Sequence, residues 1–233
     1  MKALILNSGL GSRMGDITKN HPKCMTEISD IDTILSRQLK QLKDNNIKDI
    51  IITTGYYDQV LIEYCNNLDL GLNIKFVNNP MYKNTNYIYS IYCAKDCLND
   101  DIVLMHGDLV YEDSVLKDIL NESNSVMTTS STLPLPEKDF KAVVENNHII
   151  KVGINYFDNA YAAQPLYKLN KNDWLIWLDS IIRFCENGNT GVYAENAFNE
   201  VSDKCLIYPY DVKDRLCNEI DNPEDLENVK KRI

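Results

Sequence analysis

The chain has 233 residues, of which 44% are hydrophobic and 25% are charged, and this ordinary globular composition excludes an intrinsically disordered chain. Its net charge of −10 argues against nucleic acid or an anionic membrane as the main partner. An anionic ligand would therefore be held by a few local cations and by backbone N–H groups.

The first half of the sequence alternates short apolar runs with segments of helical periodicity. Strands are predicted at residues 2–7, 49–55, 73–77 and 102–105, and helices at residues 32–45, 58–68 and 87–98. This alternation predicts an α/β fold in which helices flank both faces of a mostly parallel sheet. The carboxyl ends of the parallel strands would share one edge, where ligands bind in open α/β sheets.

The second half has a different pattern, without a linker or an internal repeat. A hairpin is predicted where residues 141–145 and 149–153 flank the turn at 146–148. Further strands are predicted at residues 125–131 and 160–169, and helices at residues 171–186, 191–201 and 223–231. We therefore expect one domain with a mixed sheet.

The seven cysteines are scattered, with no Cys-x-x-Cys pair and no zinc-site spacing. We expect them to be reduced, mostly buried thiols in a cytosolic protein. No run approaches the ~20 apolar residues of a membrane span, and no apolar run of signal-peptide length stands near residue 1.

The strongest chemical signal follows the first predicted strand. It is a glycine-rich run over residues 6–14, followed by a Pro-Lys pair that ends at Lys23. Gly9 and Gly11 allow a tight turn whose N–H groups can face phosphate oxygens. Arg13 adds a forked cation and Lys23 a point cation, which together would neutralise a triphosphate and its developing pyrophosphate.

Two commoner glycine motifs do not fit this run. Met14 stands where a dinucleotide-binding fingerprint needs its third glycine, and no Gly-Lys pair of a Walker A motif occurs. The structural alternative is a plain glycine turn with both cations on the surface. The spacing of the cations from the glycines favours phosphate binding.

The pattern Leu-x-x-Gly-x-Gly-x-Arg-Met with a downstream Pro-Lys resembles the signature of nucleotidyltransferases with a Rossmann-like, GT-A-like fold. In length and ending, the chain is most similar to small cytidylyltransferases of the phosphocholine cytidylyltransferase group. The resemblance implies that Arg13 and Lys23 are catalytic. It also implies a nucleotide-binding loop made of Leu6, Asn7, Ser8, Gly9, Gly11 and Ser12. Asn7-Ser8 replaces the Ala-Ala of many members, a change that could alter base or sugar contacts.

A second segment is in register with the first, Asn79-Pro80-x-Tyr82-x-x-Thr85-Asn86-x-x-Tyr89-Ser90. It resembles the segment with which small cytidylyltransferases hold cytosine, and amide and hydroxyl groups can match the amide-like edge of that base. The base-binding residues so implied are Asn79, Thr85, Asn86 and Ser90. An Asn-rich loop followed by a capped helix is the structural alternative.

The resemblance assigns one acid after residue 105 and one near the C-terminus to a magnesium ion that bridges the phosphates. These acids are Asp108 and Asp221. Two carboxylates plus phosphate oxygens suit Mg²⁺, which prefers octahedral oxygen coordination. Asp221 could instead cap the helix predicted from residue 223. His106 has no evident general-base partner, and an ionised phosphate acceptor needs no base.

Acceptor-binding residues are expected in two segments. Phe140 stands near the position of a cage tryptophan of the phosphocholine enzymes, which hold a quaternary ammonium by cation–π attraction, and Tyr193 and Glu195 supply an aromatic ring and an acid. Lys141 would add a cation, and if it faces the pocket a zwitterionic or amide-bearing phosphate ester fits better than choline. The resemblance also makes the phosphoglutamine cytidylyltransferases a candidate. Phosphoethanolamine and a phosphonate stay open. Core packing of Phe140 and an ordinary amphipathic helix at Tyr193 and Glu195 are the structural alternatives.

Together these features predict a Mg²⁺-dependent cytidylyltransferase that acts on CTP and a small phosphorylated acceptor, phosphocholine-like or phosphoglutamine-like. We expect residues 1–110 to form a nucleotide-binding half, and residues 111–233 to form an acceptor-binding half with a small β subregion that completes the metal site. No nucleic-acid or membrane partner is expected, and a homodimer is left open. The alternatives are a sugar-1-phosphate nucleotidyltransferase using UTP or dTTP, and a catalytically silent nucleotide sensor on the same fold.

Overall fold

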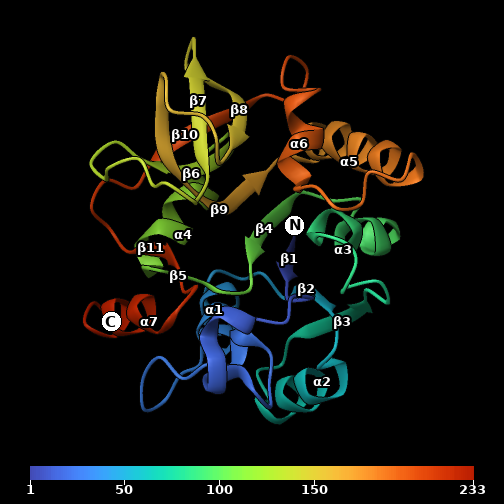
Figure 1. Cartoon of the computed structure of the whole chain (residues 1–233), viewed down its shortest axis with the longest axis vertical. Helices are drawn as coiled ribbons and strands as arrows, with labels where there is room; N and C mark the ends of the chain where they lie inside the picture. Colours follow the sequence, from blue (N-terminus) through green and yellow to red (C-terminus); the bar gives the residue numbers. More distant parts are fainter.

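A nine-stranded mixed sheet runs through the molecule, with its main strands in the order β10-β6-β9-β4-β1-β2-β3 (Figure 1). Outside this order, β7 pairs with β9, and β8 pairs with β7. The structure is a computed structural model that describes residues 1–233. The strands of this sheet are β1 (Lys2–Leu6), β2 (Asp49–Thr54), β3 (Asn73–Asn78), β4 (Ile102–His106), β6 (Ser125–Ser130), β7 (Lys141–Glu145), β8 (His148–Gly153), β9 (Ala160–Leu169) and β10 (Ile207–Asp211). A separate two-stranded sheet pairs β5 (Leu109–Tyr111) with β11 (Cys217–Glu219).

Helices cover both faces of the large sheet. They are α1 (Ile34–Asp44), α2 (Asp58–Asn67), α3 (Tyr87–Ala94), α4 (Asp113–Asn121), α5 (Lys171–Glu186), α6 (Ala194–Asn199) and α7 (Pro223–Lys230), with 3₁₀ turns η1 (Ser12–Thr18), η2 (Lys23–Met25) and η3 (Lys95–Cys97). None of these helices is long and apolar enough to cross a membrane. All seven cysteines are free; Cys93 and Cys97 are partly exposed and the others are buried.

The central strand β1 shows why both faces are covered. Its side chains alternate, so that Leu4 and Leu6 belong to one core with α3, α5 and α6, whereas Ala3 and Ile5 belong to a second core with α1, α2 and α4. A strand buried on both faces has a continuous apolar sequence without polar alternation. The predicted α/β fold is confirmed.

Parallel pairing brings the ends of the central strands to one edge. β1 runs parallel to both β2 and β4, and Leu6 pairs with Thr53 on one side and with His106 on the other. β9 is antiparallel to β4 and β6, which makes the sheet mixed. The loops that follow β1 and β4 therefore lie side by side at one edge.

The second half contains the predicted hairpin and several elements that the sequence did not reveal. In the hairpin of β7 and β8, Asn146 and Asn147 have φ values of 50° and 65°, the left-handed pair that a tight two-residue turn requires. The helix predicted at residues 191–201 is shorter, because α6 spans only Ala194–Asn199. The strands β5, β10 and β11 and the helix α4 were not predicted.

Candidate active site

The site lies where the loops after β1 and β4 meet. The Gly107 N–H donates to the Leu6 carbonyl at 3.0 Å. A Cβ atom at Gly107 would lie 1.6 Å from Asn7 Oδ1, so a larger residue there would displace the Asn7 side chain. The loops after β1 and β4 therefore pack against each other and form the base of the site, which we call its floor.

The glycine-rich loop continues from this floor into η1. Gly11 adopts a left-handed φ of 65° directly before η1, and a Cβ there would lie 3.0 Å from the Lys23 Cβ. A Cβ at Gly9, by contrast, would meet no atom within 4 Å, and the φ of Gly9 is not positive. Gly11 is thus required by the fold, whereas nothing within the chain requires Gly9.

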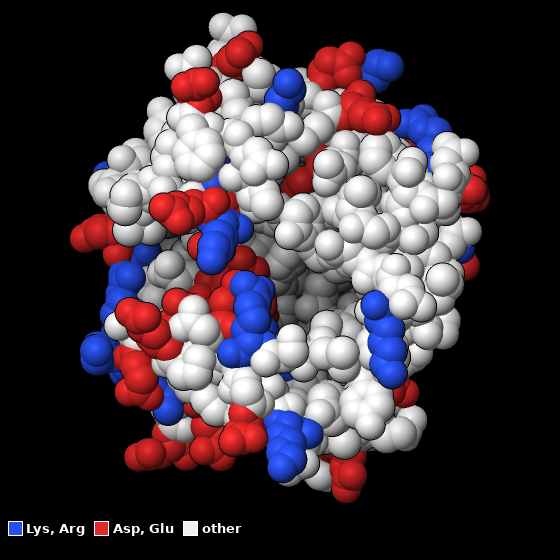
Figure 2. All heavy atoms as spheres, viewed as in Figure 1, with Lys and Arg blue, Asp and Glu red and all other residues white.

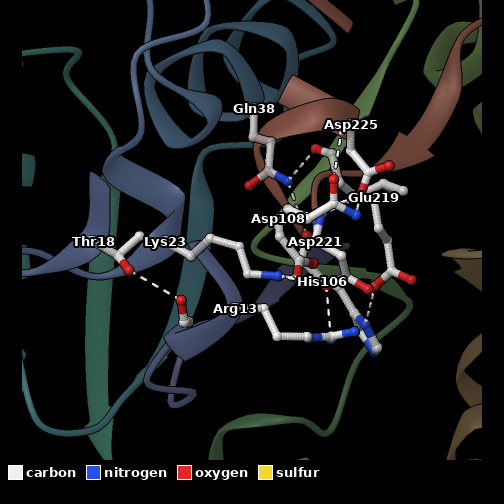
Figure 3. Close-up of polar contacts among 12 residues, drawn as sticks. Arg13, Thr18, Lys23, Gln38, His106, Asp108, Glu219, Asp221 and Asp225 are labelled. Carbon is white, nitrogen blue, oxygen red and sulfur yellow. Dashed lines mark hydrogen bonds and ion pairs between the residues drawn. The ribbon is translucent and has the colours of Figure 1, made fainter. Parts of the chain in front are cut away.

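Two cations and two carboxylates form a compact cluster on this floor (Figure 3). The Lys23 ammonium lies 2.5 Å from Asp108 Oδ2 and 2.7 Å from Asp221 Oδ1, and Arg13 Nη2 lies 2.9 Å from Asp221 Oδ1. Burial works against the Lys23 charge, but the charges and hydrogen bonds of Asp108 and Asp221 together outweigh it and raise the pKa of Lys23. Burial likewise opposes the Asp108 charge, yet Lys23 and His106 hold the pKa of Asp108 below its usual range.

The pairing of β5 with β11 brings the C-terminal acid to the cluster. Glu219 pairs with Leu109, and the Ile220 N–H donates to the Asp108 carbonyl at 2.9 Å. The N-cap of α7 is Asn222, whose side chain accepts from two N–H groups of the first turn. The cap position, which was the structural alternative for Asp221, is therefore taken by its neighbour Asn222, and the Asp221 carboxylate faces the cations.

His106 does have a partner, contrary to the expectation from sequence. Its Nδ1 lies 2.8 Å from Glu219 Oε1. Burial and the nearby Asp108 charge raise the pKa of Glu219 to about 7, although the hydrogen bond from His106 opposes the shift. Burial would lower the pKa of His106, but Glu219, together with the charges of Asp108 and Glu195, outweighs it and raises that pKa. The pair was missed because 113 residues separate its members.

The donor set fits a divalent cation. Asp108 Oδ1 is buried and has no hydrogen-bond partner, so one carboxylate oxygen is available to a ligand. One ligand atom each of His106, Asp108 and Glu219 lies within 4.8 Å of the others. Carboxylate oxygens are preferred by Mg²⁺, and the Asp221 carboxylate adjoins the same cluster.

Two adjoining hollows extend along the floor, and the space-filling view shows a depression near the centre of the face with acidic and basic side chains gathered along one rim (Figure 2). The first is lined by the glycine-rich loop together with Arg13, Lys23 and Asp108. The second is lined by Asn79, Thr85, Asn86 and Ser90 with residues of the same loop, and it also reaches Asp108. Every residue predicted to bind the nucleotide lines one of the two.

Unpaired polar atoms gather in these hollows. Asn7 Nδ2, Ser8 Oγ and Asp108 Oδ1 are buried without a hydrogen-bond partner. Each buried unpaired group costs about 1–3 kcal/mol. The two hollows are therefore lined by residues with polar groups that the chain itself leaves unsatisfied.

The residues predicted to bind a base differ in whether their polar groups already have hydrogen-bond partners within the chain. The Asn79 amide donates to Thr85 Oγ1 at 3.1 Å and to Ser90 Oγ at 3.0 Å, and its oxygen accepts from the Met81 N–H. Asn79 therefore connects Thr85, Ser90 and the Met81 backbone, which are all bonded to its side-chain amide. Asn86 caps α3 through its side-chain oxygen, so the capped-helix alternative is also present, while its amide nitrogen has no partner.

A third hollow lies on the other side of His106 and has an aromatic wall. The Tyr87 ring centroid is 4.7 Å from His106 and 5.8 Å from Tyr193, and the Phe140 centroid is 5.2 Å from Tyr193. Phe140 also belongs to the core, so its packing alternative holds as well. The charged residues of this hollow include Arg13, Lys138, Asp139, Glu219 and Asp221. Tyr87 and Asp139 were not predicted as site residues.

Two residues expected to contact an acceptor do not line this hollow. Lys141 is fully buried, and its ammonium donates to the backbone carbonyls of Pro136 and Asp139. Glu195 is 1% exposed and accepts hydrogen bonds from Tyr87 and, at 2.8 Å, from Tyr167. The predicted direct contacts with an acceptor are therefore corrected. Both side chains are buried behind the third hollow and bind residues or backbone groups next to it.

Comparison with known proteins agrees with the fold and with the position of the site. Residues 2–142 match the family model described as nucleotidyl transferase. The chain belongs to the nucleotidyl transferase family, and the matched residues include both hollows along the glycine-rich loop.

Several curated relatives carry the names of cytidylyltransferases. The CTP:phosphoglutamine cytidylyltransferase of Campylobacter jejuni is 30% identical over 164 residues, which cover 67% of this chain and 63% of that protein. The choline-phosphate cytidylyltransferase of Streptococcus pneumoniae is 31% identical over 119 residues, which cover 51% of this chain and 50% of that protein. The chain thus spans less than two thirds of either relative. A choline-phosphate cytidylyltransferase of Haemophilus influenzae is 26% identical over 100% of this chain and 97% of that protein.

Solved structures share the whole fold. The CTP:phosphocholine cytidylyltransferase from Streptococcus pneumoniae superposes with a TM-score of 0.79 at 20% identity, covering 99% of this chain and 97% of that one. The inositol-1-phosphate CTP transferase from T. maritima gives a TM-score of 0.79 at 21% identity, covering 99% and 95%. At these identities the likeness establishes the fold.

Proposed function

We propose that this protein transfers CMP from CTP to a small phosphorylated acceptor and releases pyrophosphate. The observation that carries the proposal is the meeting of three hollows at Asp108: two that suit a nucleotide and one with an aromatic wall. The names of the cytidylyltransferase relatives support CTP as the donor.

In this proposal the two halves of the chain have different roles: the first binds the nucleotide, and the second contributes to binding the acceptor. The residues that line the two nucleotide hollows all lie between Leu6 and Asp108. The third hollow also draws on the second half, through residues 138–140, Tyr193, Glu219 and Asp221. Residues from about 111 onward would thus bind the acceptor and complete the metal site.

In the reaction, an oxygen of the acceptor phosphate attacks the α-phosphorus of CTP. The bond between that phosphorus and the bridging oxygen breaks, and pyrophosphate leaves with the bond's electron pair. Arg13 and Lys23 stabilise the charge that develops on the transferred and leaving groups. The acceptor phosphate is ionised near pH 7, so no side chain has to remove a proton.

The acids of the cluster serve the same step. Asp108 and Asp221 would hold Mg²⁺, which supplies charge neutralisation and orientation of the phosphates when bound. Lys23 contacts both acids and lines the first nucleotide hollow, so its ammonium can turn from the carboxylates towards the α-phosphate.

The third hollow suits an acceptor with an amine or amide end. Its Tyr87, Phe140 and Tyr193 rings can pack against an apolar or cationic group. The carboxylates of Asp139 and Glu219 can accept hydrogen bonds from nitrogen. A phosphocholine-like acceptor would use the aromatic rings, because its quaternary ammonium has no N–H to donate, whereas a phosphoglutamine-like acceptor also has N–H groups for the carboxylates.

Pyrophosphate release tests the proposal. The chain is incubated with Mg²⁺ and CTP, UTP or dTTP, against phosphocholine, phosphoethanolamine, phosphoglutamine, aminoethylphosphonate and glucose-1-phosphate. We expect release with CTP and one nitrogen-bearing acceptor, its loss in Lys23→Met, and its retention in the matched control Lys19→Met, whose lysine is exposed and lines no hollow. Release with UTP or dTTP and glucose-1-phosphate alone would contradict the proposal, and CTP binding without any release would favour a nucleotide sensor.

A further inference from the structure

The segment that connects β6 to β7 contributes one side of the acceptor hollow. Residues 131–140 contain neither helix nor strand, yet Lys138, Asp139 and Phe140 from this segment line the hollow. An irregular segment has no ladder of backbone hydrogen bonds to fix it, so its position must come from other contacts.

The hydrogen-bonded part of those contacts comes from Lys141. Between residues 134 and 139, the only hydrogen bonds are those that the Lys141 ammonium donates to the carbonyls of Pro136 and, at 3.1 Å, of Asp139. Before this stretch Ser130 Oγ accepts from the Leu133 N–H, and after it the Phe140 carbonyl accepts from the Ala163 N–H. One side chain therefore fixes the middle of the segment.

The surroundings of Lys141 are unusual for a lysine. The residue is fully buried, forms no ion pair with a carboxylate, and has the Phe157 ring centroid 4.4 Å from its ammonium. Burial lowers the pKa of Lys141. A buried ammonium must be compensated, and the two carbonyls and the ring face are the groups that do so.

We propose that Lys141 is a positioning residue that anchors residues 134–139, so that Asp139 and Phe140 face the acceptor. The effect on catalysis rests on the proposed function of the third hollow. Lys141 would never touch the acceptor; its ammonium acts through two carbonyls. The nucleotide hollows, built from residues up to Asp108, should not sense its loss.

The test compares Lys141→Met with Lys151→Met. Methionine keeps an unbranched apolar chain and removes the ammonium, and Lys151 is an exposed lysine on β8 of the same hairpin. For Lys141→Met we expect the KM of the acceptor to rise about tenfold, as for the loss of a charge-assisted hydrogen bond, with the KM of CTP within about twofold of wild type. Lys151→Met should leave both unchanged.

Limited trypsin digestion gives a second measurement that needs no acceptor. Lys138 is exposed and lies within the anchored stretch, so cleavage after it reports release of the segment. We expect Lys141→Met to be cleaved there several times faster than wild type, and Lys151→Met at the wild-type rate.

The possible outcomes distinguish a failure of the anchoring role of Lys141 from a failure of the proposed CMP transfer. An unchanged acceptor KM together with unchanged cleavage after Lys138 would overturn the anchor. If Lys141→Met does not fold, Phe157→Ala decides instead, because Phe157 is 53% exposed and its loss should still speed cleavage; unchanged cleavage in that variant would again overturn the anchor. A wild-type chain that transfers CMP to no acceptor would defeat the proposed function, while the cleavage rates would still decide the anchor.

Discussion

Gly9→Ala should abolish most nucleotide binding without harming the fold. The Cβ that alanine adds would meet no atom within 4 Å, and the φ of Gly9 is not positive, so the folded chain accepts it without strain. Gly9 lines both nucleotide hollows, however, and a methyl group there would occupy space meant for a phosphate. The prediction thus separates a glycine kept for a ligand from one kept for the backbone.

The size of each effect follows from the geometry. Replacing glycine by alanine at a compatible position stabilises a protein by about 0.4–1 kcal/mol, which for a chain of this length raises Tm by about 1–4 °C. Crowding a close contact costs about 1–3 kcal/mol, equivalent to about 5- to 150-fold in the Kd of CTP. Gly11→Ala should instead lose about 1–2 kcal/mol of stability, because Gly11 has a φ of 65° and its Cβ would lie 3.0 Å from Lys23.

Calorimetric titration with CTP and thermal unfolding of the same samples measure both effects. Gly191→Ala is the matched control, because its Cβ also meets no atom within 4 Å and it lines none of the three hollows. The reasoning would be refuted if Gly9→Ala bound CTP as tightly as wild type, or if its Tm fell as far as that of Gly11→Ala.

Three further results are expected. Removing divalent cations with EDTA should stop pyrophosphate release, added Mg²⁺ should restore it, and Asp108→Asn should lower kcat by at least about 100-fold at saturating Mg²⁺. Glu195→Ala should lower the free energy of unfolding in urea by about 2–6 kcal/mol, since it leaves the hydroxyls of Tyr87 and Tyr167 buried without partners, whereas Glu195→Gln should lose less. Burial raises the pKa of Cys65 to about 12, so its thiol should resist iodoacetamide at pH 8 until urea unfolds the chain, as mass spectrometry of the labelled peptides would show.

Local patterns predicted the elements that carry their own signal. The central parallel strands β1, β2 and β4 are largely buried on both faces, so each contains a continuous apolar run. The edge strand β3 is only partly buried. The hairpin of β7 and β8 was evident from Asn146 and Asn147, two residues that tolerate a positive φ. The glycine-rich loop was found because its cations lie at fixed spacings from the glycines.

Elements that depend on distant pairing were not visible. The strands β5 and β11 are only three residues long and gain their structure from each other, although the paired residues Leu109 and Glu219 are 110 positions apart in the sequence. This pairing places Glu219 beside His106 and Asp221 beside Lys23. The geometry of the acidic cluster, unlike the identity of its acids, therefore had no local signature.

The two corrected residues show a more general limit. Lys141 and Glu195 lie behind the residues of the third hollow, and residue type alone could not reveal that neither side chain lines it. Each is buried and hydrogen-bonded to a residue that lines the third hollow: Glu195 accepts from the Tyr87 hydroxyl, and Lys141 donates to the Asp139 carbonyl. A buried charge is costly unless it is compensated, so these residues make sense as fixed supports whose compensation comes from within the chain. Under the proposed function, acceptor preference depends on this supporting layer as well as on the residues that line the third hollow, and we expect substitutions at Lys141 or Glu195 to change it without direct contact with the substrate.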